Sequence, residues 1–153
     1  MNRRSLIVSS SIALVALALT GCAASMHDDM HTAMHGTPAN ANSVVFQVSD
    51  NDPAKWNLAL NNARNVKQEF GDKPVQIEIV AYGPGIGMLK ADSPTANRVS
   101  EAIASGVQVV ACQNTMKGQK LTPADMNPTV GYVPAGVVEL MKRQQQGWAY
   151  IRP

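Results

Sequence analysis

The fold of this chain is decided by the stretch Val107-Gln-Val-Val-Ala-Cys112-Gln-Asn-Thr-Met-Lys117. Its first six residues are typical of a short buried strand, and the polar residues after Cys112 predict a turn that opens a helix. Because open α/β sheets bind ligands outside the carboxyl ends of their strands, Cys112 lies where such folds carry out chemistry. Asn114 is a candidate cap for the helix, since its side chain can accept a hydrogen bond from a free backbone N–H.

Cys112 is a candidate nucleophile. The backbone N–H groups near Asn114 and Thr115 carry partial positive charge at the start of the helix, and Lys117 adds a full charge. Such charges favour the thiolate over the thiol, which lowers the pKa of a cysteine and makes it more reactive. For this chemistry we expect the sulfur to lie open to solvent. The alternative is a small apolar residue that finishes a strand in the core and does not react.

Short strands and helices alternate on both sides of this stretch. Besides the strand that ends at Cys112, β-rich runs predict strands at 43–48, 75–82, 129–133 and 148–151. Apolar stripes with a period of 3.6 residues predict helices at 53–70, 94–105 and 134–146. Such alternation is typical of a single α/β domain, in which helices cover both faces of a parallel sheet.

Right-handed crossovers between parallel strands place the carboxyl ends of the strands at one edge of the sheet. We therefore expect this edge to contain Asp50, Tyr82, Gly83, Cys112 and Pro134. The residues most relevant to chemistry would then lie together, although they are far apart in the sequence.

A glycine-rich segment, Gly83-Pro-Gly-Ile-Gly-Met88, follows the second predicted strand. Its pattern lacks the register of a dinucleotide-binding loop and the Lys-Ser/Thr of a phosphate loop, and Pro84 removes one N–H donor. We interpret it as a tight turn in which Gly83 and Gly85 bring the backbone close to the residues that follow Cys112.

Three charged residues lie within the segments that are predicted to form the core. Glu78 interrupts a strand that is otherwise apolar, which indicates a solvated position at the sheet edge; a cleft or a subunit contact is the alternative. In the last helix, Glu139 and Arg143 have the spacing of an i, i+4 ion pair. The residues expected to form the core of that helix are Val137, Val138, Leu140 and Met141.

Residues 1–21 are typical of a lipoprotein signal peptide. A basic start is followed by an apolar run at 6–19, which is short for a membrane span. The end of this segment, Leu19-Thr-Gly-Cys22, resembles the lipobox of bacterial lipoproteins. That resemblance implies cleavage before Cys22, lipid on its sulfur, and export to the periplasmic face of a bacterial membrane, and Ala23 favours the outer membrane. An ordinary signal peptide is the alternative.

The processed chain is expected to keep Cys112 as its one free thiol. If Cys22 is acylated, Cys112 has no partner for an intramolecular disulfide. In an oxidising compartment such a thiol must be buried, paired between chains, or used.

Residues 22–42 form a polar tether between the lipid and the domain at 43–153. Within it, Met and His recur together at a spacing of four residues. The repeated residues are Met26, His27, Met30, His31, Met34 and His35. On a helix these side chains would lie along one side, and imidazole with thioether suits copper. The tether is therefore a possible copper site, and an inert linker is the alternative.

The charge balance argues against nucleic acid as a partner. The formal net charge of +2 comes from Arg3 and Arg4, which lie in the segment expected to be removed. The remaining chain has no basic patch, and only 5% of its residues are aromatic.

Several segments of the domain at 43–153 are similar to one known family. They are Val44-Val-Phe46, Asn51-Asp-Pro-Ala-Lys-Trp-Asn57, Ile77-Glu-Ile-Val-Ala-Tyr-Gly-Pro-Gly85, Ala111-Cys-Gln-Asn-Thr-Met116, Val133-Pro-Ala-Gly136 and Gln146-Gly-Trp-Ala-Tyr-Ile-Arg-Pro153. Together they resemble the DsrE/DsrF-like family. The resemblance implies a three-layer α/β/α fold with a mostly parallel five-stranded sheet, which often assembles into homotrimers or hexamers.

The resemblance also implies a role for the thiol. In members that traffic sulfur, a cysteine after the third strand carries sulfur as a persulfide, and Cys112 occupies that position. A sulfur carrier or thiol-handling protein, rather than a turnover enzyme, is therefore the first hypothesis, with donor and acceptor unidentified. The well-described members are cytoplasmic, whereas this chain is expected to be exported, so function transfers less securely than fold. The alternatives are a metal-binding lipoprotein that uses the tether, and a non-catalytic oligomeric interaction module.

Overall fold

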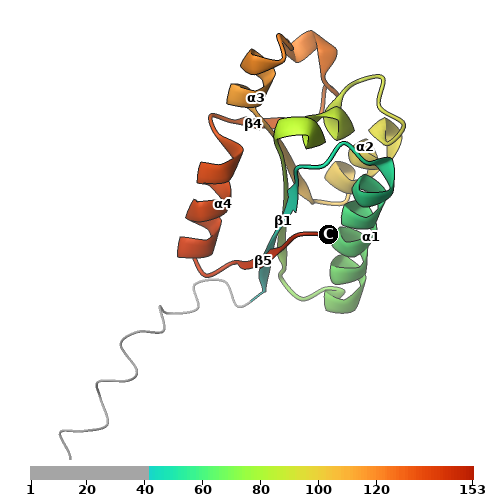
Figure 1. Cartoon of the computed structure of the whole chain (residues 1–153). Helices are drawn as coiled ribbons and strands as arrows, with labels where there is room; N and C mark the ends of the chain where they lie inside the picture. Colours follow the sequence, from blue (N-terminus) through green and yellow to red (C-terminus); the bar gives the residue numbers. More distant parts are fainter. Residues whose placement is uncertain (1–41) are drawn as a thin grey trace, which may run out of the picture. The chain divides into compact units, whose positions relative to one another are not determined.

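Five parallel strands form the centre of the domain in the computed structural model, which describes residues 42–153 (Figure 1). The strands are β1 (Ser43–Val48), β2 (Gln76–Ala81), β3 (Gln108–Cys112), β4 (Gly131–Val133) and β5 (Ala149–Ile151). Their order in the sheet is β4-β3-β2-β1-β5, and each neighbouring pair is parallel. The predicted α/β fold with a five-stranded sheet is confirmed, and the sheet is wholly parallel within the described residues.

Helices cover both faces of this sheet. The α-helices are α1 (Pro53–Phe70), α2 (Ala96–Ala104), α3 (Gln113–Gly118) and α4 (Gly136–Gln145), and the 3₁₀ helices are η1 (Gly83–Leu89) and η2 (Pro123–Asp125). Figure 1 shows α1 and α2 on one side of the sheet and α4 on the other. None of the helices in the described part is long and apolar enough to cross a bilayer.

The signal peptide at 1–21, the lipidation site Cys22 and the Met/His tether lie outside the described residues, apart from residue 42. These predictions therefore stay predictions.

Local sequence explains where α1 begins and ends. The side chain of Asp52 accepts a hydrogen bond from the Ala54 N–H at 2.8 Å, and Pro53 occupies the first turn, where its missing N–H is not needed. Gly71 ends the helix with a φ of 54°, a conformation that favours glycine. The predicted limits of this helix are confirmed.

The two faces of the sheet carry cores of very different size. The face under α1 and α2 buries a large apolar cluster that includes Phe46, Trp56 and Ile79. The face under α4 buries only Val45, Val80, Leu140 and Trp148 as its apolar cluster. Apolar burial therefore contributes much less to holding α4 than to holding α1 and α2.

Glu78 corrects the sequence interpretation. The prediction of a solvated position at the sheet edge is wrong, because β2 lies in the middle of the sheet and Glu78 is 1% exposed. Its carboxylate meets Arg143 of α4, with 2.5 Å between Oε2 and Nε. Strand order depends on how distant segments pair, so the sequence around Glu78 did not reveal it.

The inward face of α4 also differs from the prediction. Leu140 is buried as expected, but Val137, Val138 and Met141 are 62%, 39% and 51% exposed. The residues that turn inward are Gly136, Glu139, Leu140 and Arg143, which have the i, i+3, i+4, i+7 spacing of one helix face. Two of these carry charges, and Arg143 is neutralised by Glu78 and Glu139, so the apolar stripe points outward instead.

Candidate functional site

Cys112 is the last residue of β3 and also the N-cap of α3. Its sulfur accepts a hydrogen bond from the Thr115 backbone N–H, with 3.4 Å between the two atoms. The expectation that Asn114 caps this helix is wrong, because the helix begins immediately after the strand and Cys112 itself takes the capping position. Strand and helix therefore meet at the sulfur.

The surroundings of Cys112 favour its thiolate. Burial raises the pKa of the thiol. Hydrogen bonds from the Thr115 hydroxyl and from the backbone N–H groups of Gly136, Thr115 and Asn114 together lower the pKa by more than burial raises it. The net result is a pKa below the ordinary value of a cysteine. Hydroxyl and backbone N–H groups produce this shift, whereas Lys117 is exposed on α3.

The start of α4 lies beside the thiol. Gly136 is its first residue, and the Asn114 N–H donates to the Pro134 carbonyl at 3.1 Å, which ties the segment before α4 to α3. A ten-residue helix such as α4 carries partial positive charge at its N-terminus. Two helix N-termini therefore converge on the Cys112 sulfur.

The glycine-rich segment makes the predicted contact with the residues after Cys112. The Gly83 N–H donates to the Thr115 hydroxyl oxygen at 2.9 Å, and the Gln119 side chain donates to the Gly83 carbonyl at 3.2 Å. A Cβ atom at Gly85 would lie 2.4 Å from the carbonyl oxygen of Val48, so only glycine fits there. The tight turn thus orients Thr115, whose hydroxyl remains free to donate to the sulfur.

Asp50 lies at the same edge of the sheet but farther along it. Since β2 separates β1 from β3, Asp50 is two strand spacings away from Cys112, roughly 10 Å. Its carboxylate is 3.2 Å from Lys55 and 3.3 Å from Arg152, and the hydrogen bond from Lys55 lowers its pKa more than partial burial raises it. Asp50 is therefore engaged in surface ion pairs rather than with the thiol.

Tyr82 lies between these two groups, at the end of β2. Burial raises the pKa of its phenol, and the neighbouring Tyr150 adds to the effect. Its ring also packs against the start of α4, where a Cβ atom at Gly136 would lie 2.9 Å from Tyr82 Cβ. Tyr82 thus contributes a wall of the site rather than a charge.

The thiol is more enclosed than expected. Cys112 is 5% exposed, so the expectation of a sulfur open to solvent is not met. The groups around it include N–H and hydroxyl donors from α3 and α4, whereas an inert core cysteine would have only aliphatic neighbours.

A groove of about 510 Å³ lies next to α3 on the outer side of the site. Its lining consists of Gln113, Asn114, Met116, Lys117, Leu121, Pro123, Tyr132 and Pro134. Lys117 supplies the only formal charge among these lining residues. Asn114 and Pro134 therefore connect this groove to the enclosed thiol.

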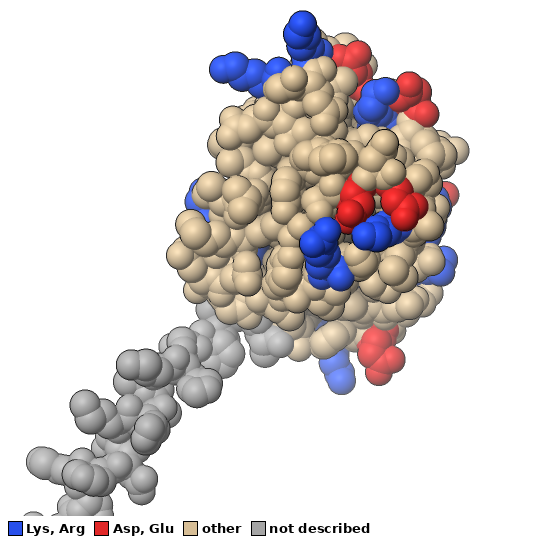
Figure 2. Space-filling model, viewed as in Figure 1, with Lys and Arg blue, Asp and Glu red and all other residues tan. Residues whose placement is uncertain are grey.

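Charges elsewhere on the described surface are mixed. Figure 2 shows Lys and Arg dispersed over the visible face, several of them next to Asp or Glu. Within residues 42–153 no three His, Cys, Asp or Glu side chains gather in a way that would hold a metal ion. The Met and His residues proposed as copper ligands, including His27, His31 and His35, lie outside the described residues.

Sequence reasoning missed the contribution of Gly136 to this site. The segment Val133-Pro-Ala-Gly136 places a glycine in the first turn of a helix. Glycine is unfavourable inside helices, so its presence there needs a reason. That glycine was a signal of a close approach between helix and sheet. Its partner, Tyr82, is more than fifty positions away in the sequence.

Comparisons with known proteins agree with this architecture. A sequence model of the DsrE/DsrF-like family matches residues 42–153. A solved protein of unknown function from Methanobacterium thermoautotrophicum is 37% identical, with a TM-score of 0.70 over 73% of this chain and 99% of that one. A conserved protein of unknown function from Bacteroides thetaiotaomicron is 16% identical, with a TM-score of 0.62 over 74% of this chain and 96% of that one, and shares the fold. No protein with a curated description matches.

Proposed function

The chain belongs to the DsrE/DsrF-like family, and from this premise we propose that Cys112 carries sulfane sulfur as a persulfide. Family membership suggests a role of the sulfur-relay type. The observation that carries the proposal is the place of Cys112 as the N-cap of α3, where its sulfur accepts from the Thr115 N–H at 3.4 Å. The Thr115 hydroxyl and the backbone N–H groups of Gly136, Thr115 and Asn114 lower the pKa of the thiol there. Such donors stabilise an anionic sulfur before and after it accepts a second sulfur atom.

The transfer requires no outside oxidant. The Cys112 thiolate attacks the terminal sulfur of a donor persulfide, R–S–SH, so that a new S–S bond forms at Cys112 while the S–S bond of the donor breaks. The donor leaves as the thiolate R–S⁻, and the attacking sulfur ends as Cys112–S–SH, so charge and electrons balance. An acceptor thiolate then removes the outer sulfur by the same exchange, and the protein acts as a carrier without net turnover of its own.

We propose that this chemistry takes place on the periplasmic face of a bacterial membrane. The lipobox-like residues before Cys22 support lipid attachment at that position, with the outer membrane favoured by Ala23. The tether at 22–42 would then hold the domain away from the lipid surface. A single free thiol in that compartment is better protected if it is enclosed, as Cys112 is.

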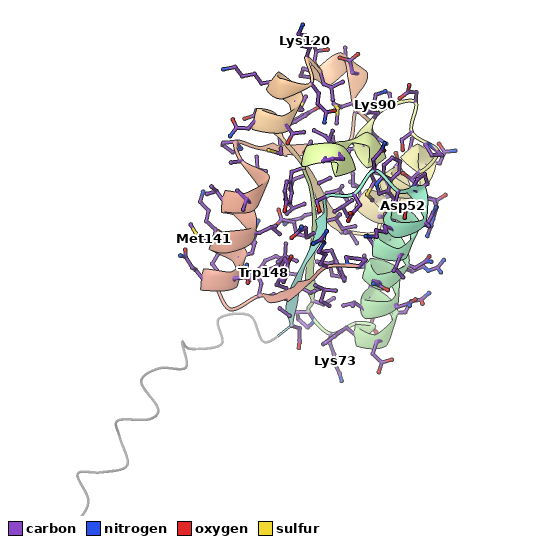
Figure 3. The ribbon with its side chains drawn as sticks, in the orientation of Figure 1. Asp52, Lys73, Lys90, Lys120, Met141 and Trp148 are labelled. Carbon is purple, nitrogen blue, oxygen red and sulfur yellow. The ribbon has the colours of Figure 1, made fainter. Side chains whose placement is uncertain are left out.

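We also propose that the domain forms a homo-oligomer through α4. Val137, Val138 and Met141 present three exposed apolar side chains on its outer face, and Figure 3 shows Met141 directed away from the sheet. Apolar residues grouped on one helix face are typical of surfaces covered by another protein. A trimer or hexamer of this chain would cover them.

Persulfide formation at Cys112 is tested by incubating the purified domain with inorganic polysulfide and measuring its mass. We expect a gain of one sulfur atom that is removed by dithiothreitol or cyanide, and no gain in a Cys112→Ser variant. A wild-type protein that gains no sulfur, or that gains it equally in the variant, would contradict the proposal.

A further inference from the structure

A buried ionic cluster lies beneath α4, at the end of the helix opposite to the thiol. Glu78 of β2 is 1% exposed, and its Oε2 is 2.5 Å from Nε of Arg143. The same Nε is 3.0 Å from Oε1 of Glu139, and the guanidinium lies 4.6 Å from the centre of the Trp148 ring. Arg143 thus connects α4 to the central strand and to the segment that leads into β5.

This cluster is the polar contact between α4 and the sheet. The apolar cluster on this face contains only Leu140 from the helix, with Val45, Val80 and Trp148 beside it. Val137 and Met141 are 62% and 51% exposed, so they add little burial against the sheet. Because removing one partner of a buried ion pair leaves the other charge uncompensated, the pair of Glu78 with Arg143 is a specific contact that fixes the C-terminal half of α4.

The position of α4 matters for Cys112 because the segment before the helix is tied to α3 by the Asn114 N–H, which donates to the Pro134 carbonyl at 3.1 Å. The N–H of Gly136, the first residue of α4, also lowers the pKa of the thiol. Gly136 and Arg143 are seven residues apart, about 10 Å along a helix. A helix this short moves nearly as a rigid rod, so a change in its seating at Arg143 moves Gly136 as well. The close approach of Gly136 to Tyr82 leaves little slack, since a Cβ atom there would already collide with the ring.

We infer that Glu78 and Arg143 form a positioning pair, which seats α4 on the sheet and thereby keeps the Gly136 N–H directed at the Cys112 sulfur. The pair does not touch the thiol, and its effect passes through the helix. This inference deepens the proposed function, on which it rests, because it assigns the control of thiol reactivity to residues outside the site. It also explains why a charged residue is retained in the middle of a buried strand.

The test compares Glu78→Ala and Glu78→Gln by the pH dependence of alkylation of Cys112 with iodoacetamide. Removing a negative charge by itself would favour the thiolate and lower the pKa of the thiol. Loss of the positioning contact has the opposite effect, because the Gly136 N–H drifts away from the sulfur. We therefore expect Glu78→Ala to raise the alkylation midpoint by about one to two pH units, as for the loss of one hydrogen bond to a charged group. Glu78→Gln removes the charge but keeps an oxygen that accepts from Arg143 Nε, and we expect its midpoint to lie at or slightly below that of the wild type.

Lys142→Ala is the matched control, because it removes a charge from the neighbouring exposed position of α4 without touching the cluster. Its alkylation midpoint should stay within error of the wild type. Arg143→Met is the second variant: it removes the guanidinium and keeps an aliphatic chain over Trp148. Its midpoint should rise clearly above that of Lys142→Ala, which removes the same charge without breaking the contact. It also serves if Glu78→Ala does not fold, as judged by circular dichroism.

The outcomes separate this inference from the proposed function. A wild-type thiol that titrates at the ordinary cysteine value, about 8.5, would argue against the activated thiol itself. A second outcome is a wild-type midpoint below that value that stays the same or falls in Glu78→Ala and Arg143→Met. This outcome would overturn the positioning role and leave the proposed function intact. A raised midpoint in both variants, with rescue by Glu78→Gln, supports it.

Discussion

Gly136 packs so closely against Tyr82 that a Cβ atom on the glycine would lie 2.9 Å from Tyr82 Cβ and 3.2 Å from its ring. This contact joins the start of α4 to the end of β2, and it brings the Gly136 N–H to the sulfur of Cys112. Four elements, β2, β3, α3 and α4, therefore meet around one thiol. The predictions that follow change one of these contacts at a time.

Gly136→Ala should weaken the thiolate and the fold together. The added methyl group must push α4 or Tyr82 aside, and overpacking of this kind costs about 1–3 kcal/mol of unfolding free energy. Because the displaced helix takes its N–H away from the sulfur, we expect the pKa of Cys112 to rise. Thermal or urea unfolding and the pH profile of alkylation measure the two effects.

Gly118→Ala is the control for this change. Gly118 is in α3, close to the site, but a Cβ atom there would meet nothing within 4 Å. Stability and thiol pKa should both stay close to those of the wild type. If the two alanine variants behave alike, the close contact with Tyr82 is not what shapes the site.

Thr115→Val should raise the pKa of Cys112 at almost constant side-chain volume. The hydroxyl of Thr115 accepts from the Gly83 N–H and helps to lower the pKa of the thiol, so valine removes both interactions. The Gly83 N–H then lacks its partner, which costs about 1–3 kcal/mol of unfolding free energy where no water replaces it. Thr115→Ser keeps the hydroxyl and should retain most of the wild-type reactivity. Equal alkylation profiles for the valine and serine variants would contradict this role.

Glu78→Gln should alter how stability depends on pH. Burial raises the pKa of the Glu78 carboxyl above its ordinary value of about 4.3, although Arg143 opposes the shift. Between the ordinary and the raised value, the folded protein therefore holds a proton that the unfolded chain has already lost. The stability contributed by Glu78 is present below the ordinary value and is lost as the pH rises through the raised value. We expect the variant to gain stability relative to the wild type as the pH rises through this window, measured by urea unfolding at a series of pH values.

Asp125→Asn provides a control of opposite sign for that series. Hydrogen bonds from the Thr122 backbone N–H and hydroxyl lower the pKa of Asp125, so its contribution is present above the ordinary value and is lost as the pH falls. Relative to the wild type, this variant should therefore lose stability as the pH rises through the corresponding window. Slopes of the same sign for both variants would show that Glu78 does not titrate as proposed.

Met141→Glu should reduce the oligomeric state without unfolding the domain. Met141 is 51% exposed on the outer face of α4, so a charge is tolerated there in a single chain but not inside an apolar contact between copies. Sedimentation velocity of the wild type and the variant measures the change. Gln68→Glu adds the same charge on the exposed surface of α1, on the other side of the sheet, and should leave the assembly intact. A wild-type protein that sediments as a monomer would rule out this assembly.

Several features of the site were accessible from local sequence. The strand that ends at Cys112, the helix that follows it, and the tight turn at Gly83 all reflect short-range patterns of apolar, polar and glycine residues. The pairing of Glu139 with Arg143 also follows from a spacing of four residues within one helix. Asn114 was the wrong cap because strand and helix adjoin without the turn that the polar residues indicated.

The sequence by itself determined the alternation of strands and helices, and with it a parallel sheet covered on both faces, because periodicity and helix caps are properties of neighbouring residues. Only the tertiary structure decided that Glu78 is buried in the centre, that α4 turns its charged side inward, and that Gly136 reaches Tyr82 and Cys112. Each of these depends on the order in which strands pair and on contacts between segments tens of residues apart. Local patterns do not encode such contacts, since the same residues would fit a solvated edge or a buried ion pair equally well until the partner is in place.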